Sequence, residues 1–370
     1  MTFIWLITAI ISLFYTILIA FFTTGWVKRK KKYNQQSLSG TFVSVIVVAR
    51  NEERNISVLL KALSEQLYRN FEIIIIDDHS TDKTYQIIED FKLSNCKLIK
   101  LNKNLKGKKV SLTNAMSLAK GELIATTDAD CIPGKNWLQS LVTCFEIEHA
   151  VFIIGPVKQI TSNNFFQQLF SLDFLSLQAT GAGAANMNKP FICNGANLAF
   201  AKLVWEKISG SIYNKYASGD DVFLLHEVTK ILPAKNIRFL FSDDSIVLTK
   251  PPANVPAFFN QRIRWASKAK GYKNEISVIT SFIVLFMNIL LFGLLTASFF
   301  SIQFFYCFLF VLILKSVIDF PVLYLSAVFY KQQKLLWYYV PLQLVYYIYT
   351  SVIVIFSLFG KYKWKERNCR

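Results

Sequence analysis

The chain has 370 residues, a formal net charge of +17 and a hydrophobic content of 53%. This apolar content argues against a wholly soluble protein and predicts that part of the chain lies in lipid. The positive charge favours an anionic partner: a membrane surface, a nucleic acid or a phosphorylated substrate. The six Cys residues are scattered without a Cys-x-x-Cys pair, which argues against a disulfide framework or a zinc site and favours a reduced, cytoplasmic main domain.

The first 27 residues carry no charged side chain. A helix of that length crosses a hydrocarbon core about 30 Å thick. The alternative is a cleaved signal peptide, but its basic residues precede the apolar run, whereas here the cluster Lys28–Lys32 follows it. The positive-inside rule then predicts an integral protein of the cell inner membrane, with its N-terminus outside and the main domain cytoplasmic. Residues 28–40 are predicted to form a basic and polar linker.

Residues 41–274 are predicted to form one α/β domain. Four apolar runs predict strands of a buried parallel sheet, at 42–48, 71–76, 98–101 and 123–127. Three amphipathic stretches alternate with them and predict helices, at 51–67, 84–91 and 110–119. This alternation is typical of βαβ units. Further along, residues 163–180 predict another helix, and residues 189–201 a loop that leads into a strand.

Residues 275–360 are predicted to form about three membrane helices, at 277–299, 303–328 and 336–359. Lys315 and Asp319 interrupt the middle one at helical spacing, so we expect them to pair inside the bundle. The tail 361–370 is basic and should prefer the cytoplasm, yet three spans would leave it outside. Either one run is re-entrant or interfacial, or the tail breaks the rule.

Acidic side chains follow two of the predicted strands. Asp128 and Asp130 come directly after the strand at 123–127, and Asp77 and Asp78 end the strand at 71–76. An Asp-x-Asp pair by itself is more often an ordinary acidic turn. Ligands of open α/β sheets, however, bind beyond the carboxyl ends of the strands. Asp128 and Asp130 are therefore predicted to hold a divalent cation, Mg²⁺ or Mn²⁺, and through it a diphosphate.

The neighbouring segments supply groups for a nucleotide. Arg50, Asn51 and Glu52 end the first strand and lie beside the Asp77–Asp78 pair. They either cap a helix or contact a nucleoside. Lys108 follows a glycine in a lysine-rich stretch, which is most often a solvated surface but can also approach a diphosphate.

Two later segments also have a structural and a functional interpretation. Asp220 and Asp221 begin a predicted helix, where they act either as caps or as a general base. The basic aromatic segment Gln261–Trp265 (QRIRW) precedes the first C-terminal span. Such segments are usually interfacial helices, and a guanidinium there can also clamp a leaving phosphate.

Seven motifs in order, ARNEE, IIDDHSTD, KGKK, TTDADC, NGAN, SGDD and QRIRW, resemble those of the family 2 glycosyltransferases of the GT-A fold. The resemblance covers about residues 43–265 and is closest to membrane members such as ceramide glucosyltransferases and polysaccharide synthases. It implies an α/β, Rossmann-like nucleotide-sugar-binding domain with a mainly parallel sheet and transmembrane helices at both ends. It also implies inverting transfer of a sugar from a nucleotide-sugar donor, with a UDP-sugar favoured, to a hydroxyl of a lipid or glycan acceptor.

The resemblance also implies roles for individual residues. Asp221 matches the catalytic base, although the family usually has Glu-Asp where this chain has Asp220-Asp221. Asp128 and Asp130 match the metal ligands. The implied donor-binding residues are Arg50, Asn51, Glu52, Asp77, Asp78, Lys108, Asp128 and Asp130. The implied acceptor and diphosphate residues are Asn197, Gln261, Arg262, Arg264 and Trp265.

Three other interpretations follow from the same features. A processive polysaccharide synthase needs a channel, for which three C-terminal spans are few. A non-catalytic membrane scaffold should have gaps in its acidic set, and this chain has none. Nucleic-acid binding is disfavoured because the basic residues cluster beside the membrane spans, which fits a membrane partner better. The sequence specifies no oligomeric state.

Overall fold

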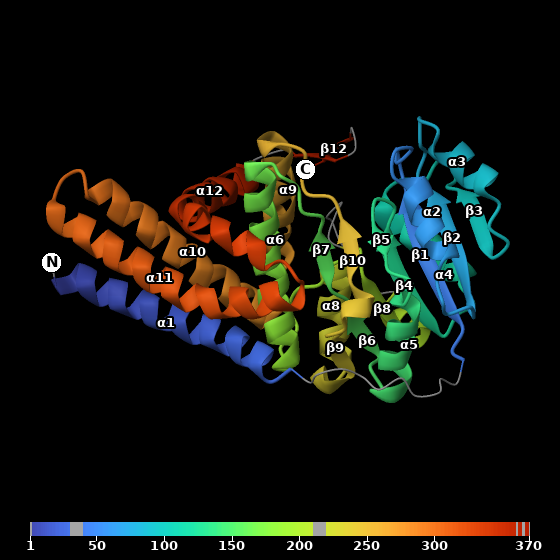
Figure 1. The fold of residues 1–370 in the computed structure, drawn as a ribbon, viewed down its shortest axis with the longest axis horizontal. Helices are drawn as coiled ribbons and strands as arrows, with labels where there is room; N and C mark the ends of the chain where they lie inside the picture. Colours follow the sequence, from blue (N-terminus) through green and yellow to red (C-terminus); the bar gives the residue numbers. More distant parts are fainter. Residues whose placement is uncertain (1, 30–39, 210–219, 360–361, 365–366, 370) are drawn as a thin grey trace.

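The computed structural model describes residues 2–29, 40–209, 220–359, 362–364 and 367–369. Most of the predicted linker 28–40 and part of the predicted tail 361–370 therefore lie outside the described residues. Figure 1 shows an α/β domain beside a bundle of long helices, with the N-terminal helix α1 (Thr2–Val27) in the bundle.

The main sheet has seven strands in the order β3-β2-β1-β4-β8-β6-β9. Their bounds are β1 Val43–Ala49, β2 Phe71–Asp77, β3 Cys96–Lys100, β4 Leu123–Asp128, β6 Phe152–Ile154, β8 Leu198–Ala201 and β9 Ile237–Phe239. Strand β8 runs antiparallel to β4 and β6, and the other pairs are parallel. The sheet is therefore mainly parallel, as predicted. A second sheet joins β5 (Ile132–Pro133), β10 (Val247–Thr249) and β7 (Val157–Gln159).

The register of the central strands brings the predicted acidic clusters to one edge. Ala49 pairs with Asp77 across β1 and β2, and Val48 pairs with Asp128 across β1 and β4. The carboxyl ends of β1, β2 and β4 are thus level. This edge is where an open parallel sheet binds its ligands.

Helices cover both faces of the sheet. The helices of the α/β domain are α2 Ile56–Ser64, α3 Thr84–Phe91, α4 Lys108–Leu118, α5 Trp137–Ile147, α6 Phe165–Asn186, α7 Lys202–Ile208, α8 Asp220–Ile231 and α9 Val255–Ser267. Strand side chains alternate between the faces. Val45 and Val47 share a core with residues of α2 and α5, whereas Ile46 and Ile74 share one with residues of α4, α6 and the bundle. The membrane-like helices are therefore continuous with the core of the domain.

Two predicted helices have different bounds in the structure. The helix predicted at 51–67 begins only at Ile56. Asn51 has a left-handed φ of 50°, and its Oδ1 accepts a hydrogen bond from the Thr81 N–H at 2.9 Å, so the segment before α2 forms a turn against the loop after β2. The helix predicted at 163–180 continues to Asn186.

Helix α1 packs tightly against the extended end of α6. A Cβ at Gly25 would overlap the Gly183 carbonyl, and one at Gly183 would overlap the Phe22 carbonyl. Trp26 Nε1 donates to the Ala179 carbonyl and Asn186 Nδ2 to the Gly25 carbonyl, both at 2.7 Å. The C-terminal end of α1 is thus fixed to α6 of the α/β domain.

Within the described residues, four helices are long and apolar enough to cross a membrane. They are α1, α10 (Glu275–Ala297), α11 (Ile302–Phe329) and α12 (Tyr339–Phe359), the last preceded by the 3₁₀ helix η4 (Gln333–Tyr338). Lys315 Nζ pairs with Asp319 Oδ2 at 2.6 Å, which confirms the predicted pair. Asp319 Oδ1 also accepts from Tyr15 Oη at 2.7 Å, so the pair ties α11 to α1.

Helix α12 packs on the α/β domain as well as on the bundle. The Tyr349 hydroxyl donates to Asp173 Oδ1 of α6 at 2.6 Å, and its ring lies 5.5 Å from that of Phe258 in α9. Strands β11 (Tyr362–Trp364) and β12 (Arg367–Cys369) follow as a hairpin, and β11 contacts α9. In Figure 1 β12 lies beside α9, whereas the N-terminus lies at the opposite end of the bundle.

Candidate active site

A single cavity of about 840 Å³ joins the carboxyl edge of the sheet to the helix bundle. At the sheet it is lined by Arg50, Glu52, Lys108, Asp128 and Asp130. In its middle it is lined by Asp221, Gln261, Arg264, Trp265 and Lys268. In the bundle its walls come from α1, α10, α11 and α12, with Phe22, Val284, Val322 and Tyr346 among them. The cavity therefore has a polar end and a mainly apolar end.

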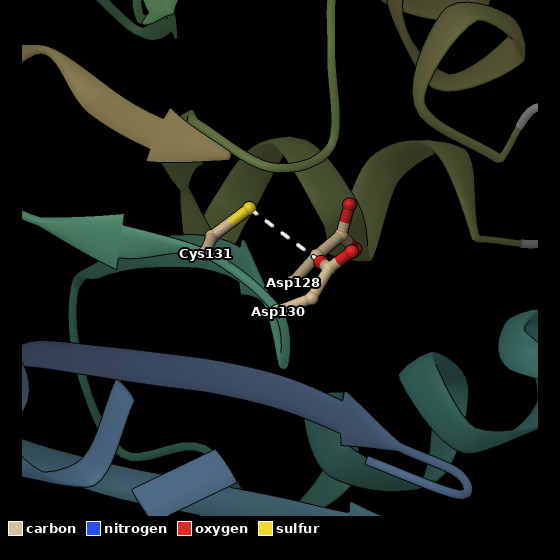
Figure 2. A group of neighbouring side chains, drawn as sticks. All are labelled: Asp128, Asp130 and Cys131. Atoms are coloured by element: carbon tan, nitrogen blue, oxygen red, sulfur yellow. Dashed lines mark hydrogen bonds between the residues drawn. The ribbon is translucent and has the colours of Figure 1, made fainter. Parts of the chain in front are cut away.

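Asp128, Asp130 and Cys131 form a compact group after β4. Ligand atoms from the three side chains lie within 4.8 Å of one another, and Figure 2 shows the two carboxylates side by side. Lys108 Nζ forms an ion pair with Asp128, so the group already attracts a cation. Burial, and then the charges of Asp130 and Asp128, raise the pKa of the Cys131 thiol well above its usual value, so that it stays protonated. The carboxylates suit a hard divalent cation and the neutral thiol does not.

The segments after β1 and β2 hold one another in place. Arg50 Nη1 donates to the backbone carbonyls of Asp78 and His79 at 2.7 and 2.9 Å. The Asp78 carboxylate accepts from the Gly107 N–H at 3.2 Å, where Gly107 has a φ of 103° that favours glycine. The neighbouring Asp77 is 3% exposed, and its Oδ1 has no hydrogen-bond partner among the described residues. A buried, unpartnered carboxylate oxygen suits a ligand that donates a hydrogen bond.

Asp221 lies in the cavity wall at the start of α8. Its carboxylate accepts from the backbone N–H of Gly195 and of Val222, each at 2.9 Å. Lys268 Nζ lies 3.9 Å from Asp221 Oδ1. Burial alone would raise the pKa of Asp221, but Lys268, Lys108 and the two backbone donors outweigh it and lower that pKa below its ordinary value. Asp221 is thus an ionised, fixed acceptor. The neighbouring Asp220 is the first residue of α8, and its side chain lies outside the described residues.

Helix α9 presents the QRIRW segment to the cavity. Gln261, Arg264 and Trp265 all line it. Arg262 lines the cavity as well, but its guanidinium is mostly buried, forms an ion pair with Asp173 of α6 and stacks on Trp265 at 4.4 Å. Arg262 therefore helps to pack α9 on α6, and its role toward the acceptor or diphosphate stays a prediction.

Asn197 is held by buried partners. It is fully buried, with Oδ1 accepting from Trp137 Nε1 at 2.9 Å and Nδ2 donating to the carbonyls of Pro156 and Ser245 at 2.8 Å. These hydrogen bonds fix Asn197 inside the core, and its predicted role at the acceptor stays a prediction. The other three residues of the NGAN motif, Asn194, Gly195 and Ala196, line the cavity, and the Gly195 N–H holds Asp221.

Two charged side chains that line the cavity, Asp173 and Lys268, were not predicted from the sequence. Asp173 is the one charged residue of α6, a signal that it would need a partner if buried. Lys268 had no comparable signal, because it is one of many basic residues near the membrane. Lys268 follows α9 directly, and its closeness to Asp221 depends on how this segment lies against the start of α8.

Comparison with known proteins agrees with this architecture. Residues 44–206 match the family model described as glycosyl transferase family 2. A beta-monoglucosyldiacylglycerol synthase from Nostoc sp. is 36% identical over 131 residues, which is 34% of this chain and 28% of that protein. The probable glycosyltransferase YdaM of Bacillus subtilis is 28% identical over 233 residues, 60% of this chain and 54% of that protein. The matched segments thus span roughly a quarter to a half of the length of these relatives.

The mannosyltransferase PcManGT from Pyrobaculum calidifontis, solved in complex with GDP-Man and Mn²⁺, has a similar fold. The superposition covers 96% of this chain and 99% of that one with a TM-score of 0.56 at 17% sequence identity. At this identity the likeness concerns the fold. The family match is thus confined to residues 44–206, and the mainly parallel sheet, the carboxylates at its edge and the similar fold of the mannosyltransferase agree with a GT-A fold.

Proposed function

We propose that the protein transfers a sugar from a nucleotide-sugar donor to a hydroxyl of a lipid acceptor, with inversion at the anomeric carbon. The observation that carries this proposal is the continuous cavity, which joins the acidic edge of the sheet to the space between apolar helices. A donor diphosphate suits the first end and a lipid chain suits the second. The similarity to the Nostoc beta-monoglucosyldiacylglycerol synthase supports a lipid acceptor.

The donor is assigned to the edge formed by β1, β2 and β4. Asp77, with its unpartnered Oδ1, is proposed to accept a hydrogen bond from the nucleoside, and Arg50 and Asp78 keep the surrounding loops in place. Asp128 and Asp130 would hold a divalent cation, Mg²⁺ or Mn²⁺, which supplies positive charge for the diphosphate when bound. We favour a UDP-sugar as the donor.

The transfer needs a base that accepts the proton of the attacking hydroxyl, and positive charge that stabilises the departing nucleoside diphosphate. The acceptor oxygen bonds to the anomeric carbon on the face opposite to the diphosphate, the bond from that carbon to the diphosphate breaks, and the hydroxyl proton passes to Asp221. The nucleoside diphosphate leaves as an anion. Arg264 and Lys108 line the cavity and can neutralise its growing charge.

The membrane arrangement follows from the same structure. We propose that α1, α10 and α11 cross the membrane with the α/β domain in the cytoplasm, and that α12 lies obliquely and returns the chain to the cytoplasmic side. The contacts of α12 with α6 and α9, and of β11 with α9, support this. It removes the conflict over the basic tail, which then obeys the positive-inside rule. We keep the predicted division of the chain into anchor (1–27), linker (28–40), α/β domain (41–274), C-terminal helices (275–360) and tail (361–370) as part of this proposal.

A screen of nucleotide-sugar donors tests the function. The purified protein, in detergent with a mixture of membrane lipids and Mn²⁺, should release the diphosphate of one donor and place its sugar in an organic-extractable product. A long water-insoluble polymer would instead favour the processive synthase. Release of no diphosphate from any donor would contradict the enzymatic proposal.

A further inference from the structure

The cavity stops at the same depth on the three crossing helices. Its last lining residues are Tyr15 on α1, Asn288 on α10 and Lys315 on α11. Asn288 is 13 positions beyond the start of α10, and Lys315 is 14 positions before the end of α11. At 1.5 Å per residue, both lie about 20 Å along their helices from the α/β domain. We name these three residues, with Asp319 and Gln343, the cavity floor.

The cavity floor is polar although it lies among apolar helices. Lys315 Nζ donates to Asp319 Oδ2 at 2.6 Å and to Gln343 Oε1 at 3.0 Å, and Gln343 Nε2 donates to Asp319 Oδ2 at 3.2 Å. Tyr15 donates to the other carboxylate oxygen of Asp319. A hydrocarbon chain end gains nothing from such a surface, because it cannot form hydrogen bonds with it.

One strong acceptor of the floor is not used. Asn288 is 1% exposed and donates through Nδ2 to the Val284 carbonyl at 2.7 Å, but its Oδ1 has no partner among the described residues. Thr280 also lines the cavity, on the same helix but nearer the α/β domain. Its buried hydroxyl has no hydrogen-bond partner among the described residues. Backbone and side-chain polar groups inside a membrane normally find partners, because leaving them unpaired is costly.

We infer that the cavity floor is a binding site for a hydrogen-bond donor carried along the hydrophobic chain of the acceptor lipid, a mid-chain hydroxyl, with Asn288 Oδ1 as its acceptor. This inference rests on the proposed lipid acceptor. It makes Asn288 a specificity-determining residue, remote from the transfer chemistry. A lipid that carries such a hydroxyl is then preferred to an otherwise identical lipid without one.

Two matched lipids test the inference. Diricinoleoylglycerol has one hydroxyl in the middle of each chain, and dioleoylglycerol lacks it. Binding of each to the full-length protein in detergent is measured by titration, without any donor. The wild type should bind the hydroxylated lipid about three- to ten-fold more tightly, the range expected for one hydrogen bond inside a membrane protein. Asn288→Leu, which keeps the volume but removes the acceptor, should bind both lipids equally.

Ser281→Ala is the matched control. Ser281 also lines the cavity on α10, but its hydroxyl already donates to the Ser277 carbonyl at 2.7 Å, so this variant should keep the wild-type preference. Equal binding of the two lipids by the wild type, undetectable binding of both, or a preference that survives in Asn288→Leu would each overturn the inference. A preference as predicted in a protein that transfers no sugar would leave the inference standing and contradict the proposed function.

Discussion

The Lys268 ammonium lies 3.9 Å from Oδ1 of Asp221, and both side chains line the cavity between the sheet and the bundle. Lys268 is 7% exposed, so water screens this pair weakly. Together with the backbone donors at Gly195 and Val222, the pair fixes both the charge and the orientation of the carboxylate. This relationship keeps Asp221 ionised and oriented, so that its carboxylate is able to accept a proton.

Replacing that carboxylate should stop transfer without loss of the fold. Asp221→Asn keeps the size of the side chain and an oxygen for the backbone donors, but it cannot take the proton. The rate should fall by about 10²–10⁴-fold or more. Donor affinity should change little, because the nucleotide residues lie at the carboxyl edge of the sheet. Initial rates and a donor titration measure both effects. Asp220→Asn is the control and should be milder; if it is instead the inactive variant, the base is assigned to the wrong carboxylate.

The acid limb of the pH profile should depend on Lys268. Burial would raise the pKa of Asp221, and Lys268 is the strongest influence that lowers it; the balance leaves the pKa below its ordinary value. The ionised form is active, so activity persists above the pKa and is lost as the pH falls through it. Lys268→Gln removes the lowering charge, so its acid limb should move to higher pH. If the acid limb of the kcat/KM profile stays at the wild-type pH in Lys268→Gln, then Lys268 does not set the pKa of the base.

Activity should depend on the two carboxylates after β4 and on a divalent cation. EDTA should abolish transfer and added Mn²⁺ should restore it. Asp128→Asn or Asp130→Asn should cost about 10²–10³-fold in kcat, the usual loss when one electrostatic stabiliser of a leaving group is removed. Cys131→Ala is the control: a protonated thiol is a poor ligand for a hard cation, so this variant should keep its Mn²⁺ dependence. Full activity of the wild type in EDTA would refute the cation assignment.

The crossing of α1 and α6 leaves no room for a side chain. Gly183→Ala would place its Cβ onto the Phe22 carbonyl. We expect a loss of about 1–3 kcal/mol in the free energy of unfolding, as for other overpacked contacts. Gly293→Ala is the control, because a Cβ at Gly293 of α10 meets no atom within 4 Å. Thermal unfolding in detergent compares the two, and equal stability would mean that α1 does not pack on α6 as described.

A reporter-fusion or cysteine-labelling map tests the membrane arrangement. The map should place Ser37, Gly107 and Lys268 on the cytoplasmic side. Because α12 returns towards α9, a reporter after Arg370 should be cytoplasmic as well. A C-terminal reporter on the outer side would show that α12 crosses the membrane, and Gly107 on that side would deprive the enzyme of a cytoplasmic donor.

The sheet and the acidic edge were predictable because they depend on local pattern. The buried strand Phe71–Asp77, for example, contains the apolar run Ile73–Ile76, and parallel strands bring their carboxyl ends together by geometry alone. The Lys315–Asp319 pair was predictable for the same reason, since one turn of helix separates the two.

What the sequence did not predict depends on long-range packing. Asn197 and Arg262 were assigned to the site by motif, but their partners in the structure, Trp137 for Asn197 and Asp173 for Arg262, lie 60 and 89 positions away in the sequence. The closeness of Lys268 to Asp221 requires the segment after α9 to lie against the start of α8, and the cavity floor requires four helices from both ends of the chain. No local pattern records these contacts.

The most direct test of the account is the chemical form of the transferred sugar. Purified wild-type protein is incubated with the labelled donor found by the screen, Mn²⁺ and diacylglycerol in detergent, and the products are separated by organic extraction and mass spectrometry. The account predicts one sugar joined to one lipid through an inverted anomeric bond, and no such product from Asp221→Asn. A sugar that is only hydrolysed, is joined with retention, or appears in a lipid-free polymer would contradict the claim that the cavity delivers a lipid hydroxyl to the donor.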